Sequence, residues 1–139
     1  MKIKREATDA QIPTLGTDGA GAFDCYAYHG VMLFPGEQQK IPLGFRMEVP
    51  VGHVALLVPR SSTGSRGLHL ANVVGVIDSD YRGSVMAVLR NNSNDEIPIT
   101  RGDRICQMLI VPVVTPALEV VDELSSTERG TGGFGSTGK

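Results

Sequence analysis

The sequence has no tryptophan, few aromatic residues and no large excess of charge of either sign. Aromatic residues make up 5% of the chain, and 13 Lys and Arg oppose 15 Asp and Glu, for a net charge of −2. Such a chain has no global attraction to nucleic acid or to an anionic membrane. No apolar run approaches the roughly 20 residues that a membrane span needs. The composition therefore predicts a globular protein with no nucleic acid or membrane partner.

Cysteine is scarce, and the spacings that bind metals are missing. Cys25 and Cys106 are the only thiols, and each lies in an apolar segment without a CxxC motif. We expect both to be buried and reduced in a cytoplasmic protein; a disulfide between them is an alternative that no spacing supports. His29, His53 and His69 are far apart in the chain, which argues against a zinc site held by the protein. The basic N-terminal residues lack the apolar segment of a signal peptide.

Turn-forming residues, in contrast, are abundant. The 17 glycines and 8 prolines divide the 139 residues into short pieces rich in β-branched side chains, which is typical of a single all-β domain. We predict one helical turn, over residues 61–66. The predicted strands cover residues 3–5, 22–28, 39–48, 53–59, 68–71, 73–77, 84–91, 97–99, 104–114 and 118–121.

The last eleven residues, 129–139, have a composition of their own. Five of them are glycine, and Phe134 is their only large apolar side chain, so the segment cannot bury enough surface to order itself. We predict a β domain over 1–128 and a flexible arm over 129–139. Backbone N–H groups of the glycines, together with Ser, Thr and Arg side chains, are donors for an anion.

Two carboxylates and a phenol ring gather in the segment 75–83. Asp78, Asp80 and Tyr81 lie within four residues between two predicted strands, and a β-hairpin would hold them at the edge of a cleft. Acid–base chemistry needs such fixed geometry before it needs any particular pKa. The alternative is an ordinary Asp/Gly turn, the usual meaning of this composition.

Polar side chains also occur at or near the ends of other predicted strands. Arg60, Ser61 and Ser62 follow one strand, where they could bind a phosphate or form a surface turn with a helix cap. Gln107 lies within an apolar strand, where its amide needs an internal partner or a ligand. These residue types alone do not decide between the two interpretations.

In chain order, five segments resemble the five motifs of the homotrimeric dUTP pyrophosphatases (dUTPases). The segments are 21–27 (GAFDCYA), 59–62 (PRSS), 75–83 (GVIDSDYRG), 102–107 (GDRICQ) and 129–138 (RGTGGFGSTG). The resemblance implies a jelly-roll-like β-barrel or sandwich of short strands with a flexible, glycine-rich C-terminal arm. It also implies a homotrimer with three shared active sites, in which this arm closes as a lid over a site of neighbouring chains.

The resemblance further implies hydrolysis of dUTP to dUMP and pyrophosphate, which keeps uracil out of DNA and supplies dUMP for thymidylate synthesis. Asp78 resembles the general base for the water that attacks the α-phosphorus, and Gln107 resembles the glutamine near that water. The ring of Tyr81 would lie under the deoxyribose and exclude a 2′-hydroxyl, while a hairpin over 72–81 would read the uracil. The implied substrate-binding residues are Arg60, Ser61, Ser62, Asn72, Val76, Ile77, Tyr81, Arg129, Phe134, Gly135, Ser136 and Thr137.

Mg²⁺ is the cofactor that the resemblance implies. Because dUTP carries about four negative charges, a divalent ion bound chiefly by the triphosphate would complement the few protein cations. Arg60 and Arg129 are the cations among the implied binding residues. Asp24 resembles the motif aspartate that meets this ion through water.

Two alternatives stay open at this point. A dCTP deaminase has the same fold, but deamination needs a carboxylate after the hairpin, and residues 81–94 contain no Asp or Glu. A phage-type dUTPase can also bind a regulatory protein, and nothing in the sequence marks a surface for such a partner.

Overall fold

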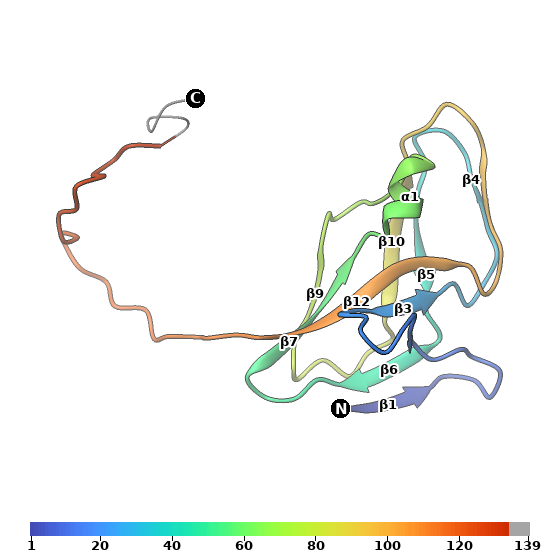
Figure 1. The fold of residues 1–139 in the computed structure, drawn as a ribbon, viewed down its shortest axis with the longest axis horizontal. Coiled ribbons are helices and arrows are strands. Elements are labelled where there is room, and N and C mark those ends of the chain that lie inside the picture. The colour runs from blue at the N-terminus through green and yellow to red at the C-terminus, as the bar shows by residue number, and fades with distance from the viewer. Residues whose placement is uncertain (134–139) are drawn as a thin grey trace.

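The computed structural model describes residues 1–133 and consists almost entirely of short strands (Figure 1). The strands are β1 (Lys2–Arg5), β2 (Thr14–Leu15), β3 (Phe23–Tyr26), β4 (Val31–Leu33), β5 (Gln38–Pro42), β6 (Phe45–Glu48), β7 (His53–Val58), β8 (Leu68–Leu70), β9 (Gly75–Ile77), β10 (Met86–Asn91), β11 (Ile97–Ile99) and β12 (Arg104–Pro112), and α1 (Ser61–Ser65) is a single helical turn. Among residues 1–133, no helix is long and apolar enough to cross a membrane.

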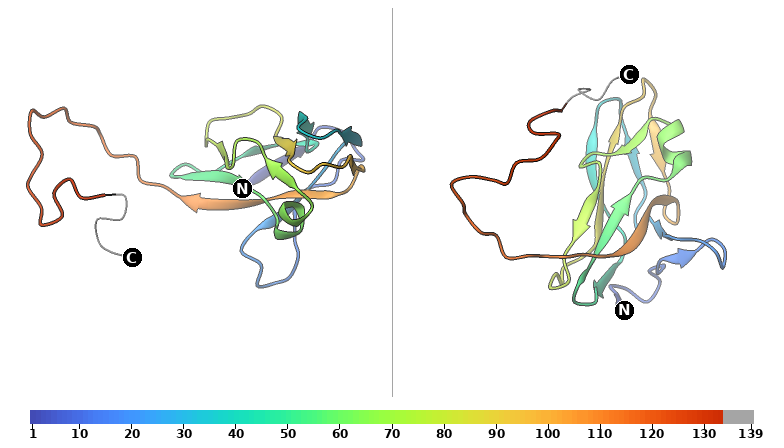
Figure 2. Two further views of the ribbon diagram at one scale, coloured as in Figure 1. Left: turned by 90° about the horizontal axis from the view of Figure 1, so that it is seen from above. Right: turned by 60° about the vertical axis from the view of Figure 1, so that its left-hand side comes forward.

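All strand pairs are antiparallel, and the strands form four sheets. The largest has the order β2-β3-β12-β7-β9, and a second has the order β5-β10-β8. The pairs β1-β6 and β11-β4 complete the arrangement, and Figure 2 shows the layered body from two further sides. Within the described part of the chain the ladders do not close into a barrel. The predicted all-β, jelly-roll-like class is therefore confirmed, in its sandwich form.

Alternating side chains build the core between the sheets. In β10, Ala87 and Leu89 are buried, whereas Met86 and Arg90 are exposed. This period of two is the one that a half-buried strand requires. Phe45, which β6 contributes, is also fully buried. One continuous apolar cluster thus joins the sheets and holds the loops between them in place.

Most predicted strands are confirmed, with ends that differ by one to a few residues, and α1 confirms the predicted turn over 61–66. The predicted strand 39–48 is in fact two strands, because Gly44 has a φ of +78° and the chain passes there from one sheet to another. A positive φ of this kind favours glycine. The sequence does not predict β2 and β4, since two or three residues are too short to show alternation.

The predicted strand over 118–121 is wrong. Its apolar side chains resemble those of a strand, but in the described residues this segment pairs with no other strand. Leu118 and Val120 are 94% and 99% exposed. β propensity reflects packing on neighbours, and Leu118 and Val120 have almost none within residues 1–133.

The chain leaves the sandwich after β12 (Figure 1). Residues 113–133 contain no helix or strand, and Leu124 is also 89% exposed. Exposed apolar side chains in such a series are typical of a surface that another molecule covers. The division into 1–128 and 129–139 stays a prediction.

The two cysteines are direct partners across β3 and β12. Cys25 and Cys106 lie opposite each other in the ladder, and both are free and fully buried. The structure confirms the expectation of two buried, reduced thiols. The hydrogen bond with Cys106, and then burial, raise the pKa of the Cys25 thiol.

We expect both thiols to resist a thiol reagent in the native protein. The thiolate is the reacting species, and neither burial nor the raised pKa of Cys25 favours it. Titration with Ellman's reagent should be at least ~100-fold slower in buffer than in guanidinium chloride, where both thiols are accessible. Similar rates in the two solvents would mean that β3 and β12 separate readily.

Candidate active site

The segment 75–83 crosses from one sheet to another. β9 pairs with β7, whereas β10 pairs with β5 and β8, so the two strands that flank the segment are not paired with each other. The expected hairpin over 72–81 is therefore wrong, because no ladder joins its two sides. Alternation shows which residues are buried but does not show which sheet receives them.

A cleft of about 450 Å³ opens between β9 and β10, a volume typical of small-molecule sites. Five of the predicted site residues line it: Asn72, Val76, Ile77, Asp78 and Tyr81. The remaining lining residues are Lys40, Leu57, Gly75, Ser84, Val85, Met86 and Val88. Apolar walls with one carboxylate, one ammonium, one amide, one hydroxyl and one phenol suit a flat, polar-edged ring beside a sugar.

The ring of Tyr81 is held by its own loop. Its hydroxyl donates a hydrogen bond to the carbonyl of Ser84 at 3.0 Å, and its backbone N–H donates to the carbonyl of Asp78 at 3.2 Å. A Cβ at Gly83 would overlap this ring. A larger residue at position 83 would therefore displace the phenol from this place, and Asp78 and Tyr81 belong to one tight turn.

Asn72 lies beside a strained backbone position. Val73 has a φ of +62°, in the left-handed region that β-branched residues rarely adopt. The N–H of Val73 donates to the carbonyl of Leu70, and that of Val74 to the carbonyl of Asn72 at 2.6 Å. Backbone strain of this kind is concentrated at functional sites, and here it lies next to Asn72, which lines the cleft.

A second group of predicted residues gathers where β3, β7 and β12 meet. Asp24 is 9% exposed and accepts hydrogen bonds from Arg60 Nε at 2.7 Å and from Arg104 Nη1 at 3.2 Å. One carboxylate oxygen serves each guanidinium. Because Asp24 is nearly buried, the ion pair holds Arg60 in one orientation more firmly than an exposed pair would.

The other residues of this group are held by short contacts. Arg60 Nη1 donates to Ser62 Oγ at 3.2 Å. Ser61 begins α1, but no side chain caps this helix, which does not favour the helix-cap interpretation. Gln107 lies opposite Asp24 in the ladder, and its Nε2 donates to the carbonyl of Pro59 at 3.1 Å.

The structure does not bring the two groups together in one cleft. None of Asp24, Arg60, Ser61, Ser62 and Gln107 lines the cleft that contains Asp78. Arg129 lies on the extended segment, and within residues 1–133 its side chain donates to the nearby carbonyl of Gly132, at 2.9 Å. The predicted residues Phe134, Gly135, Ser136 and Thr137 lie outside the described residues.

The donors that could hold a metal ion are few. In residues 1–133, no three His, Cys, Asp or Glu side chains form a group that could bind one. Both oxygens of Asp24 accept from guanidinium groups. These residues fit an ion held by a bound triphosphate, with protein oxygens reaching it only through water.

Sequence reasoning missed Lys40 and Ser84 in the cleft. Lys40 lies opposite Val88 in the β5–β10 ladder, so the pairing of strands distant in sequence brings its charge to this wall. No local motif includes it. Ser84 follows the motif segment, where its proximity to Tyr81 was the only available signal.

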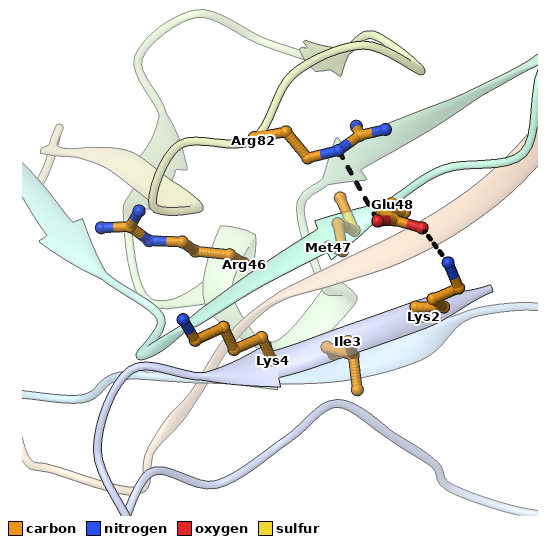
Figure 3. A pocket seen from close by; sticks show the side chains of 7 residues that line it. All are labelled: Lys2, Ile3, Lys4, Arg46, Met47, Glu48 and Arg82. Atoms are coloured by element: carbon orange, nitrogen blue, oxygen red, sulfur yellow. Dashed lines mark ion pairs between the residues drawn. The ribbon is translucent and has the colours of Figure 1, made fainter.

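A second groove, of about 400 Å³, lies between β1, β6 and the loop after Asp80 (Figure 3). It contains none of the predicted site residues. Glu48 contacts Lys2 at 2.8 Å and Arg82 at 4.0 Å, as the dashed lines in Figure 3 show. The groove is connected to the candidate site through Arg82, which lies in the loop after Asp80.

A jelly-roll-like sandwich with an acid in a nucleoside-sized cleft fits an enzyme that acts on a nucleotide. The family model for dUTPase matches residues 8–138, and the chain belongs to the dUTPase family. The deoxyuridine 5′-triphosphate nucleotidohydrolase of Anaeromyxobacter is 42% identical over 139 residues, covering 99% of this chain and 95% of the relative. That of Escherichia phage T5 is 39% identical over 146 residues, covering 99% and 98%.

A solved structure gives the same result for the fold. A mutant dUTPase of Staphylococcus bacteriophage 80alpha, with dUpNHpp, aligns with a TM-score of 0.91 and 28% identity, covering 99% of this chain and 98% of that chain. The enzyme is thus a dUTP diphosphatase, which hydrolyses dUTP to dUMP and pyrophosphate. The dUTPase prediction is confirmed in preference to the deaminase.

Proposed function

We propose that Asp78 is the general base of this dUTPase and that the cleft around it receives the nucleoside. The observation that carries the proposal is the convergence of Asp78, Asn72 and Tyr81 on one cleft. Among residues 1–133 no cation pairs with the Asp78 carboxylate. It is therefore free to accept a proton from a water molecule aligned behind the α-phosphorus.

The walls of the cleft would select the base and the sugar. The Asn72 amide offers both a donor and an acceptor to the edge of uracil, as do backbone groups at Val76 and Ile77. A rigid site that hydrogen-bonds this edge rejects cytosine, because the mismatched partners would be left unpaired. The Tyr81 ring would lie against the deoxyribose and leave no space for a 2′-hydroxyl.

The group around Arg60 would bind the phosphates. Asp24 orients the Arg60 guanidinium, and the hydroxyls of Ser61 and Ser62 add donors beside it. Gln107 donates one N–H to Pro59, which leaves its side-chain oxygen to orient the attacking water. Mg²⁺ held by the triphosphate would neutralise charge as it develops on the phosphates, with Asp24 near the ion's water shell.

We further propose that the site is shared between copies in a homotrimer. The cleft and the Arg60 group do not meet in one chain, and residues 113–133 leave the body with apolar side chains uncovered. In a trimer, the cleft of one copy and the Arg60 group of another copy would together form one complete site. In this arrangement the arm over 129–139, with Arg129, Phe134, Gly135, Ser136 and Thr137, closes over a neighbour's cleft.

The proposed compartment is the cytoplasm. Two adjacent free thiols, Cys25 and Cys106, are consistent with a reducing environment. A regulatory protein partner stays a prediction.

A mixing experiment tests the shared site. One defective protein carries Asp78→Asn, and the other lacks residues 129–139. If the base and the arm of each site come from different copies, reassembling a 1:1 mixture should restore about a quarter of the wild-type activity, since one random site in four has both intact parts. Pyrophosphate release from dUTP is the measurement.

Each protein reassembled alone is the control. Activity equal to the sum of the two controls, with mixed oligomers confirmed by native mass spectrometry, would contradict the shared site. Activity well above that sum is not possible if one copy supplies both parts.

A further inference from the structure

The loop that holds Tyr81 is anchored to the end of the first strand. Ser84 Oγ donates a hydrogen bond to Glu6 Oε2 at 2.6 Å, across 78 positions of sequence. The other oxygen, Glu6 Oε1, accepts from Arg46 Nε at 2.9 Å. The carboxylate of Glu6 therefore joins the loop to β6, and both of its oxygens are used.

Backbone contacts hold the two partners side by side. The N–H of Glu6 donates to the carbonyl of Gly44 at 2.9 Å, and the N–H of Val85 donates to the carbonyl of Phe45 at 3.0 Å. Glu6 and Ser84 thus flank the same turn between β5 and β6. Their side-chain contact is built into the fold and is not a chance meeting of two surface groups.

The contact is a charge-assisted hydrogen bond. It lies at the surface, where the side chain of Glu6 is 23% exposed, so solvent screens it in part. The hydrogen bond from Ser84, followed by that from Arg46, holds the pKa of Glu6 below its usual range. Glu6 is therefore ionised at neutral pH, and hydrogen bonds to an ionised acceptor are the stronger class.

Ser84 is also the residue whose carbonyl receives the Tyr81 hydroxyl. We propose that Glu6 and Ser84 are positioning residues that fix the Tyr81 ring, and thereby set the discrimination between deoxyribose and ribose. This inference rests on the proposed role of Tyr81. It adds Glu6 and Ser84, which lie outside the motif segment 75–83 and act through it.

The mechanism requires only that the ring stay still. A ring that excludes a 2′-hydroxyl sterically must not be displaced when a ribonucleotide enters the cleft. The Tyr81 side chain is 45% exposed, so packing alone confines it weakly. Its hydroxyl donates to the Ser84 carbonyl, and the Ser84 hydroxyl donates to the Glu6 carboxylate, so two hydrogen bonds through one residue link the ring to the strand pair β1–β6.

The test compares kcat/KM for dUTP and UTP in a set of variants. Ser84→Ala removes one hydroxyl and should lower the dUTP/UTP ratio about 10-fold, mainly through faster turnover of UTP. Glu6→Ala should do the same, and the double variant should show no further loss, because both changes break one chain of contacts. Ser84→Thr keeps the hydroxyl and should restore the ratio.

Glu48→Gln is the matched control. Glu48 is a carboxylate on the same strand pair, and within residues 1–133 its one ion pair with the loop is to Arg82, at 4.0 Å between exposed side chains. Its loss should leave the ratio unchanged. A merely structural role for Ser84 would lower kcat/KM for both nucleotides together. Thermal unfolding of each variant checks that the fold persists.

Tyr81→Ala separates the positioning role of Glu6 and Ser84 from the steric role of the Tyr81 ring. An unchanged ratio in Ser84→Ala, with a lowered ratio in Tyr81→Ala, would overturn the positioning role alone. An unchanged ratio in Tyr81→Ala would overturn the steric role of the ring and the positioning role with it. Wild-type turnover of dUTP, measured in parallel, tests the enzyme activity independently of both.

Discussion

Replacing Asp78 by Asn is expected to lower kcat for dUTP by about 10³-fold, within the range that general-base catalysis contributes. The substitution keeps the size of the side chain and removes its ability to accept a proton. Because no cation pairs with Asp78 in residues 1–133, the change breaks no ion pair there. Pyrophosphate release gives the rate, and calorimetric titration with dUpNHpp gives the affinity, which should change less than about 3-fold.

Asp80→Asn is the control for this result. Asp80 lies two residues away on the same turn and does not line the cleft, so its loss should leave kcat nearly intact. Loss of dUpNHpp binding along with activity in Asp78→Asn would assign Asp78 to the architecture of the turn. Equal loss of activity in both variants would mean that the charge of the turn matters, and not one base.

Removing residues 129–139 should lower kcat/KM for dUTP by about 100-fold or more. The reason is that a lid which closes on substrate excludes water and strengthens the charge contacts inside the site. The melting temperature should stay within about 3 °C of the full-length value, because residues 113–133 contain no strand or helix that packs on the body. Steady-state kinetics and calorimetry provide the two measurements.

Arg129→Gln gives a finer version of the truncation. If a guanidinium of the arm binds phosphate, this single change should lower kcat/KM about 10-fold and leave a dUMP-sized ligand bound as before. Normal turnover by the truncated enzyme would rule out the lid. A large fall in melting temperature would show instead that the arm has a structural role.

The sequence was enough to predict the parts of the site that are local. Asp78 and Tyr81 are close in the chain and close in the cleft, because one turn holds both. Ser62 likewise contacts Arg60, two residues before it. Motif segments keep such groups together regardless of how the sheets are arranged around them.

Contacts between distant segments were beyond sequence reasoning. The resemblance implied for Asp24 only a contact with the metal ion through water. In the structure, Asp24 accepts hydrogen bonds from Arg60, which follows β7, and from Arg104 of β12. Lys40 reaches the cleft through strand pairing, and Glu6 reaches Ser84 through the turn between β5 and β6. Each of these depends on sheet order, which alternation of apolar residues leaves undetermined.

In the proposed trimer, the segment after Pro112 would act as a tether. Fully extended, residues 113–128 reach about 50 Å, compared with about 40 Å for the width of a compact body of this size. A tail on such a tether would reach a neighbouring copy while remaining confined near it, at an effective concentration in the millimolar range. Shortening the tether by a few residues would then change how often the site closes, although no residue of the site itself is altered.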